Sequence, residues 1–240
     1  IGAMPSSYLV NQMGVAIAAQ CKRLGIQVNY APDIDINNNP SNPVINDRSF
    51  GEDKFNVTRK AYMYMKGMQD HRVLACAKHF PGHGNTDSDS HFTLPLVREL
   101  EHEIDSIALY PFRQMIRSGV SSVMVAHLSV PALDTVSGRA SSLSPDIVNG
   151  LLRKRLGFNG LIFTDALNMK GVADYFAPGE LELMAFKAGN DVLLYSDNID
   201  KGIQFSLLVL GSGVVYVEAS KVSQEVISTW NIVAGALTTT

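Results

Sequence analysis

The chain has 240 residues, of which 46% are hydrophobic and 18% are charged, and its formal net charge at pH 7 is −3. Because the sequence has neither a basic tract nor a basic excess, its composition argues against nucleic acid as a partner. No apolar stretch is long enough to span a bilayer, so we expect a globular domain with a large buried core and no membrane span.

The predicted elements alternate between amphipathic helices and short, almost continuously apolar strands. In chain order we predict a helix over 9–24, a strand over 26–31, a helix over 54–70, a strand over 73–77, a helix over 98–118, a strand over 121–126, a helix over 144–156, a strand over 160–164, a helix over 180–188 and a strand over 191–195. This alternation is typical of a parallel sheet covered by helices.

The loops decide which parallel architecture is expected. Polar, Gly-rich or His-rich residues follow the carboxyl ends of at least four predicted strands. In an eight-stranded β/α barrel all such loops meet at one mouth, whereas a doubly wound sheet uses only the loops near its switch point. We therefore predict a (β/α)8 TIM-type barrel.

Five strands cannot close an eight-stranded barrel, so we expect this one to be incomplete at the N-terminus. The chain begins on Ile1 and its first residues lack the features of a signal peptide, which also places the natural N-terminus upstream. The predicted barrel domain covers residues 1–200, and residues 201–240 are expected to add a last strand and a helix. The bacterial cytoplasm, the periplasm and secretion all stay open as locations.

Three polar segments concentrate the side chains that can do chemistry. The densest has the sequence KHFPGHGNTDSDSH over residues 78–91 and packs histidines, a lysine and acids into one loop after a strand. The second is FTDALNMKGV over 163–172, which has an aspartate at the end of an apolar strand. The third is DINNNP over 35–40, which continues to NDRSFGED over 46–53.

In this order the three segments resemble glycoside hydrolase family 3, and the form KHFPGHG…DSH is similar to its β-N-acetylglucosaminidase branch. The likeness extends from about Leu9 to about Tyr195. It implies a retaining β-N-acetylhexosaminidase that removes terminal β-linked N-acetylglucosamine through a covalent glycosyl–aspartate intermediate. The partner would be an N-acetylglucosamine-containing carbohydrate, and a cell-wall muropeptide, a chitin oligosaccharide and a host glycan all stay open, with peptidoglycan recycling as one implied role. No cofactor is implied. The family's early sugar-binding aspartate would lie upstream of this chain.

The resemblance also implies roles for six residues. Asp165 matches the nucleophile, His91 the general acid/base and Asp89 the carboxylate that orients His91. The residues that match sugar-binding positions are Lys78, His79 and Arg48.

These residue types suit the reaction on chemical grounds. A retaining glycosidase needs a carboxylate below the anomeric carbon and an acid about 5 Å away. Asp165 at a strand end is fixed by the scaffold, and His91 has an unperturbed pKa of about 6.5, suited to both proton-transfer steps. Asp89 can bind the other ring nitrogen of His91. Lys78 and Arg48 supply hydrogen-bond donors for sugar hydroxyls.

Other functions remain open on the sequence. The same scaffold could serve a β-glucosidase, a glycoside phosphorylase or a non-catalytic sugar-binding barrel. A metal-dependent hydrolase would use His79, His83, His91 and Asp89 as ligands, but their spacing matches no standard zinc motif, and we predict no metal. His83, between two glycines, is expected to brace its loop. For His127, a place in the core or the wall and contact with a ligand both stay open.

Overall fold

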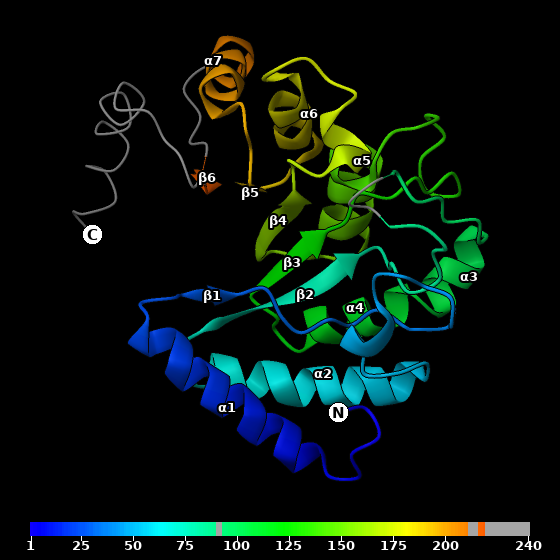
Figure 1. Cartoon of the computed structure of the whole chain (residues 1–240), viewed down its shortest axis with the longest axis vertical. Coiled ribbons are helices and arrows are strands. Elements are labelled where there is room, and N and C mark those ends of the chain that lie inside the picture. Colours follow the sequence, from blue (N-terminus) through cyan, green and yellow to red (C-terminus); the bar gives the residue numbers. More distant parts are fainter. Residues whose placement is uncertain (90–92, 211–215, 219–240) are drawn as a thin grey trace.

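The computed structural model describes residues 1–89, 93–210 and 216–218. Its strands form a single parallel sheet in which each strand pairs with the next along the chain. The strands are β1 (Val28–Asn29), β2 (Leu74–Phe80), β3 (Ser122–Val125), β4 (Leu161–Ala166), β5 (Val192–Leu194) and β6 (Tyr216–Glu218). This curled parallel sheet with covering helices is the incomplete (β/α)8 barrel that the sequence predicts (Figure 1).

The helices connect successive strands and cover the sheet from outside. The longer ones are α1 (Ser7–Arg23), α2 (Lys54–Gln69), α4 (Leu109–Arg117), the π-helix η3 (Asp146–Arg155), α6 (Glu180–Ala188) and α7 (Ile199–Leu210). The short ones are η1 (Asn46–Arg48), α3 (Glu101–Ser106), η2 (Ser141–Leu143) and α5 (Lys170–Ala173). Figure 1 shows α1 and α2 together near β1 and β2, and α6 and α7 near β5. Among the described residues, no helix combines the length and the apolar character that a membrane crossing requires.

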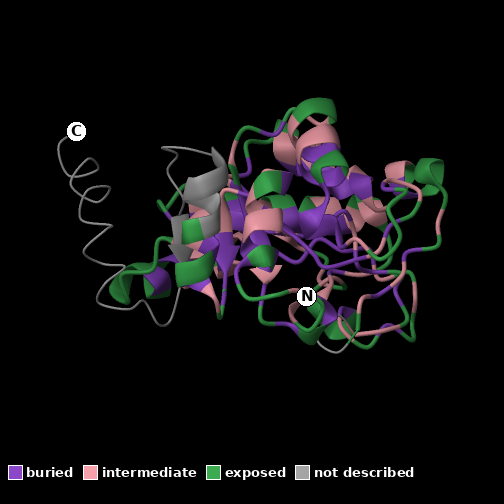
Figure 2. Cartoon of the chain, turned by 90° about the horizontal axis from the view of Figure 1, so that it is seen from above, coloured by how far each residue is buried: buried purple, intermediate pink, exposed green. Residues whose placement is uncertain are grey.

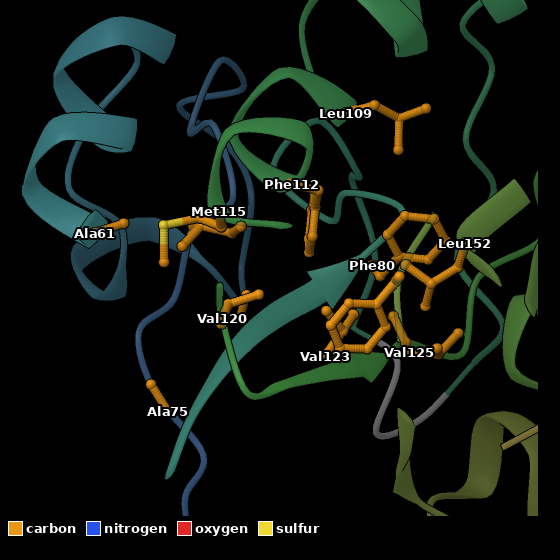
Figure 3. Packing of buried hydrophobic residues seen from close by; sticks show 14 of the residues in the cluster. Ala61, Ala75, Phe80, Leu109, Phe112, Met115, Val120, Val123, Val125 and Leu152 are labelled. Atoms are coloured by element: carbon orange, nitrogen blue, oxygen red, sulfur yellow. The ribbon is translucent and has the colours of Figure 1, made fainter. Parts of the chain in front are cut away.

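Alternate residues of the central strands pack into two different apolar clusters. Ala77 and Val123 belong to the main core under the helices, where the rings of Phe80 and Phe112 meet with centroids 5.1 Å apart (Figure 3). The intervening residues Cys76, Met124 and Phe163 form a smaller cluster on the opposite face, with Leu194. Figure 2 shows the buried residues concentrated in the interior, between the sheet and the helices that cover it. Burial on both faces explains why these strands are continuously apolar rather than alternating.

The predicted helix over 98–118 is wrong as a single element, because the structure divides it into α3 and α4. Pro111 lies in the first turn of α4. Proline has no N–H and its ring clashes with the carbonyl four residues earlier, here that of Ile107, so a continuous helix cannot pass this point. The predicted helix over 144–156 is present as η3, which has the wider π winding.

A last strand was expected within residues 201–240, and among the described residues of this tail the chain is helical up to Leu210 and extended over Tyr216–Glu218. A short apolar run cannot by itself distinguish a buried strand from a buried helix. The helix expected after Glu218 lies outside the described residues, and the proposed boundary near residue 200 stays a prediction.

Candidate active site

The carboxyl ends of the strands surround a pocket of about 320 Å³. Its walls come from β1 to β5 and from the loop around η1, as expected for the mouth of a β/α barrel. The lining residues are Tyr30, Val44, Arg48, Lys78, His79, His83, Met124, Asp165, Ala166, Leu194 and Tyr195.

Four of the six predicted site residues meet in this pocket. Arg48 comes from η1, Lys78 and His79 from β2, and Asp165 from β4. Asp89 is half-buried on the loop after β2 and is not among the lining residues. His91 lies outside the described residues, so the placement of the acid/base pair stays a prediction.

His79 is held in one orientation by contacts on both ring nitrogens. Nε2 lies 3.1 Å from Nη2 of Arg48, and Nδ1 lies 2.7 Å from Oδ2 of Asp35. Because the guanidinium can only donate, Nε2 must accept, and Nδ1 therefore carries the proton that is donated to Asp35. Burial lowers the pKa of His79 to about 4, which agrees with a neutral ring. His79 therefore orients Arg48 and does not exchange protons near neutral pH.

Asp35 is the centre of this arrangement, although the sequence assigned it no role. Its carboxylate accepts hydrogen bonds from the backbone N–H and the ring of His79 and from the backbone N–H of His83. Burial raises the pKa of Asp35, and the two backbone donors oppose that rise. The alternation of aspartate and isoleucine over 33–36 is the signal that two carboxyl groups share one side of an extended segment.

His83 and His127 are structural. His83 is 1% exposed, and its Nδ1 lies 2.6 Å from Oγ1 of Thr86, so it has the contacts expected of a loop brace. His127 is fully buried, with Nδ1 2.7 Å from Oγ of Ser142 and Nε2 3.0 Å from the carbonyl oxygen of Ala166. His127 therefore supports the backbone that follows Asp165 from within the core.

Asp165 stands at the end of β4, where the strand leads into the pocket. Oδ1 accepts a hydrogen bond of 2.8 Å from the backbone N–H of Ala166. Burial works to raise the pKa of Asp165, but His79, His127, the Ala166 N–H and Lys78 outweigh it and leave the pKa below its ordinary value. The carboxylate is therefore ionised at neutral pH, as a nucleophile must be.

Within the described part of the chain, Asp33, Asp35 and His79 are the group with the spacing of metal ligands. The ring nitrogens of His79 are already engaged, and Nε of Arg48 lies 3.6 Å from Oδ2 of Asp33. A cation at this point would have to displace hydrogen bonds beside a guanidinium, so we assign no metal to these residues.

The glycosyl hydrolase family 3 N terminal domain matches residues 1–228. The Beta-hexosaminidase A of Pseudoalteromonas piscicida is 41% identical over 189 residues, which make up 75% of this chain and 32% of that protein. The structure of a glycoside hydrolase family 3 beta-N-acetylglucosaminidase from a Paenibacillus species is 34% identical, with a TM-score of 0.79, over 93% of this chain and 48% of its own. A beta-glucoside phosphorylase structure is 28% identical, with a TM-score of 0.82, over 86% of this chain and 39% of its own.

The chain thus spans about a third of the curated relative and about half of the acetylglucosaminidase. The family match covers nearly the whole chain, and the pocket is lined by side chains from each of the three sequence segments. The chain therefore belongs to glycosyl hydrolase family 3, in the region of that family's N terminal domain.

Proposed function

We propose that the protein containing this chain is a retaining β-N-acetylhexosaminidase that hydrolyses terminal β-linked N-acetylglucosamine. The observation that carries the proposal is the ionised Asp165 carboxylate, which faces the same pocket as Arg48, Lys78 and His79. The beta-hexosaminidase and beta-N-acetylglucosaminidase relatives support the choice of sugar. An N-acetylglucosamine-containing cell-wall muropeptide is the natural substrate that we propose, which would give the protein a role in peptidoglycan recycling.

The proposed reaction has two steps. The Asp165 carboxylate attacks the anomeric carbon and forms a glycosyl ester, while His91 donates a proton to the leaving oxygen. Water then attacks the same carbon and frees Asp165, and His91 takes the proton of that water. Asp89 is proposed to hold His91 through its second ring nitrogen.

The remaining pocket residues are proposed to bind the sugar. Arg48 and Lys78 present cationic donors toward the space above Asp165, and donors of this type bind hydroxyl oxygens. The Asp35–His79–Arg48 contacts hold the guanidinium before the sugar arrives, which reduces the entropy lost on binding.

The test is turnover by the natural full-length protein of chromogenic β-N-acetylglucosaminide, β-glucoside and β-xyloside. We expect a clear preference for the first substrate. A 2-fluoro glycosyl inhibitor should label the protein at Asp165, and peptide mapping locates the label. A label on another residue would refute the assignment of the nucleophile.

A glycoside phosphorylase is the second candidate, since a beta-glucoside phosphorylase has the same fold at a TM-score of 0.82. In that reaction phosphate replaces water in the second step. The same assay with and without inorganic phosphate distinguishes the two, because a phosphorylase releases a sugar 1-phosphate and a hydrolase releases the free sugar.

A further inference from the structure

A second buried carboxyl group, that of Asp33, lies directly behind the pocket. Asp33 is 8% exposed and continues the β1 segment alongside Lys78 of β2. Its Oδ1 accepts a long hydrogen bond of 3.2 Å from the backbone N–H of Asp35. Among the described residues, no group donates a hydrogen bond to Oδ2, although burial normally demands one.

Oδ2 of Asp33 faces the arginine and the histidine that define the pocket. It lies 3.6 Å from Nε of Arg48 and 3.8 Å from Nδ1 of His79. The charged and titratable groups that face it are therefore Asp35 from its own segment, His79 from β2 and Arg48 from η1. A separation of 3.6 Å is an ion-pair distance that is too long for a hydrogen bond.

The contacts of the two aspartates decide which one takes up a proton. Three N–H groups donate to the carboxylate of Asp35, whereas one donates to that of Asp33. Hydrogen bonds of this kind favour the charged form, so the proton goes to Asp33. Burial, followed by the charge of Asp35, raises the pKa of Asp33 to about 7, which agrees with this order.

The protonation state of Asp33 determines how strongly the guanidinium of Arg48 is held in place. Nη2 of Arg48 donates to His79, and Nη1 donates to the carbonyl oxygen of Val44 at 3.3 Å. Nε is the remaining donor group, and it faces Oδ2 of Asp33. An ionised carboxylate attracts this N–H strongly, whereas a neutral carboxyl group attracts it weakly. The side chain of Arg48 is 42% exposed, so its position depends on these few contacts.

We propose that Asp33 is a positioning residue that fixes the Arg48 guanidinium when its carboxyl group is ionised and releases it when that group is protonated. The proposal rests on the proposed function in one respect, namely that Arg48 binds the sugar. A guanidinium that is held in place loses less freedom when substrate binds, so affinity increases with pH across the neutral range. Asp33 does not touch the reacting atoms, so its effect falls on KM and not on the pH midpoints of kcat.

The experiment compares the natural full-length protein with its Asp33→Asn variant, which keeps the shape of the side chain and removes its titration. We expect the KM of wild type for chromogenic β-N-acetylglucosaminide to decrease about threefold between pH 6 and pH 8, a small change because the ion pair is partly exposed. In Asp33→Asn that decrease should disappear, while the pH midpoints of kcat stay those of wild type.

Asp134→Asn is the matched control. Asp134 is 5% exposed and pairs with Arg139, so this variant also loses a buried aspartate–arginine contact, but away from the pocket lining. Its KM should keep the pH dependence of wild type. An Asp33→Asn variant that also keeps that dependence would overturn the proposal.

A second measurement does not depend on activity or on a variant that folds. The Nε–H resonance of Arg48 in wild type should shift in an NMR titration with a midpoint near pH 7, because burial raises the pKa of Asp33 to about 7. A resonance that does not move between pH 5 and pH 9 would overturn the role of Asp33 even if the enzyme is active. Conversely, the shift without any glycosidase activity would leave the Asp33–Arg48 contact in place and refute the proposed function alone.

Discussion

Asp165 and Asp33, both near the pocket, have different environments, and their neighbours account for the difference. Asp165 has His79, His127 and Lys78 around it and keeps a pKa below the ordinary value despite its burial. Asp33 lies beside another carboxyl group, and burial together with that neighbour raises its pKa. One fold therefore lowers the pKa of Asp165 and raises that of Asp33 through the groups that surround each carboxyl group.

Replacement of the nucleophile gives the largest kinetic effect that we predict. Asp165→Ala should lower kcat by about 10⁴-fold or more, on the order of 5–6 kcal/mol, because the proposed glycosyl ester forms on this carboxylate. Steady-state kinetics on the natural full-length protein measures it. The exposed Asp174, at the end of α5, provides the control Asp174→Ala, which should keep wild-type kinetics. A loss below tenfold for Asp165→Ala would contradict the mechanism.

His91→Ala should depend on the leaving group. Substrates with a nitrophenol leaving group need little protonation, so the glycosylation step should be slowed less for them than for substrates with alkyl or sugar leaving groups. Pre-steady-state rates across leaving groups of different pKa measure this. An equal loss for all of them would contradict the role of His91 as the acid.

Asp33→Asn should change the pH dependence of stability. Burial raises the pKa of Asp33 to about 7, so the folded chain keeps a proton that the unfolded chain loses near pH 4. This stabilisation is complete below pH 4 and is lost as the pH rises through about 7. Relative to wild type, the variant should therefore gain on the order of 2–4 kcal/mol in unfolding free energy between pH 5 and pH 8.

Urea denaturation of the full-length protein at the two pH values measures the effect. Asp134→Asn is again the control. Burial works to raise the pKa of Asp134, but hydrogen bonds from Arg139 and others outweigh it and leave the pKa lowered. Its contribution is therefore constant between pH 5 and pH 8. An Asp33→Asn variant with the same pH profile as wild type would show that Asp33 is already ionised at pH 5.

The sequence predicts the site residues that lie at the ends of strands, but it does not predict the buried residues that contact them. Lys78, His79 and Asp165 lie at the ends of apolar strands, so their meeting in one mouth follows from parallel topology. Asp33 and Asp35 could not be assigned in the same way. Their importance depends on burial and on which donors surround each carboxyl group, and neither is visible in the sequence.

The elements pack closely where glycines allow it, and the crossing of α1 and α2 is the clearest case. Gly14 of α1 and Gly67 of α2 lie in the contact, and a Cβ at Gly67 would stand 2.3 Å from the carbonyl oxygen of Asn11. Gly67→Ala should therefore separate the two helices and lower the unfolding free energy by about 1–3 kcal/mol, as overpacking does.

Gly150 offers the control, since a Cβ there would have its nearest neighbour, the carbonyl oxygen of Pro145, at 3.8 Å. Gly150→Ala should change stability little. Thermal melting of both variants in the full-length protein decides the matter, and equal melting temperatures would contradict the predicted close approach.

The type of each element was more predictable than its limits. Strand-then-helix periodicity identified β1 to β5, but β1 is only two residues long and β2 continues to Phe80. The division between α3 and α4 could have been predicted from Pro111, because its missing N–H breaks a helix. The helix in the tail could not be predicted from the sequence, because a continuous apolar run has no periodicity that distinguishes a helix from a strand.

For the whole molecule, sheet order is the property that local sequence determines best. Each strand pairs in parallel with the next one along the chain, as is usual for consecutive strands joined by a helix. The edges of the sheet are a different matter. Among the described residues, β1 is paired only with β2, and β6 only with β5.

The open edges lead to a prediction about the stretch Ile1–Thr240 made alone. Unpaired N–H and C=O groups along a strand edge bind other edges, and soluble proteins cover or charge them. We therefore expect this stretch to associate or aggregate and to hydrolyse β-N-acetylglucosaminide poorly, whereas the natural full-length protein is active. Light scattering, thermal melting and hydrolysis assays measure these properties. A monomeric product with a cooperative melt and full activity would contradict this prediction.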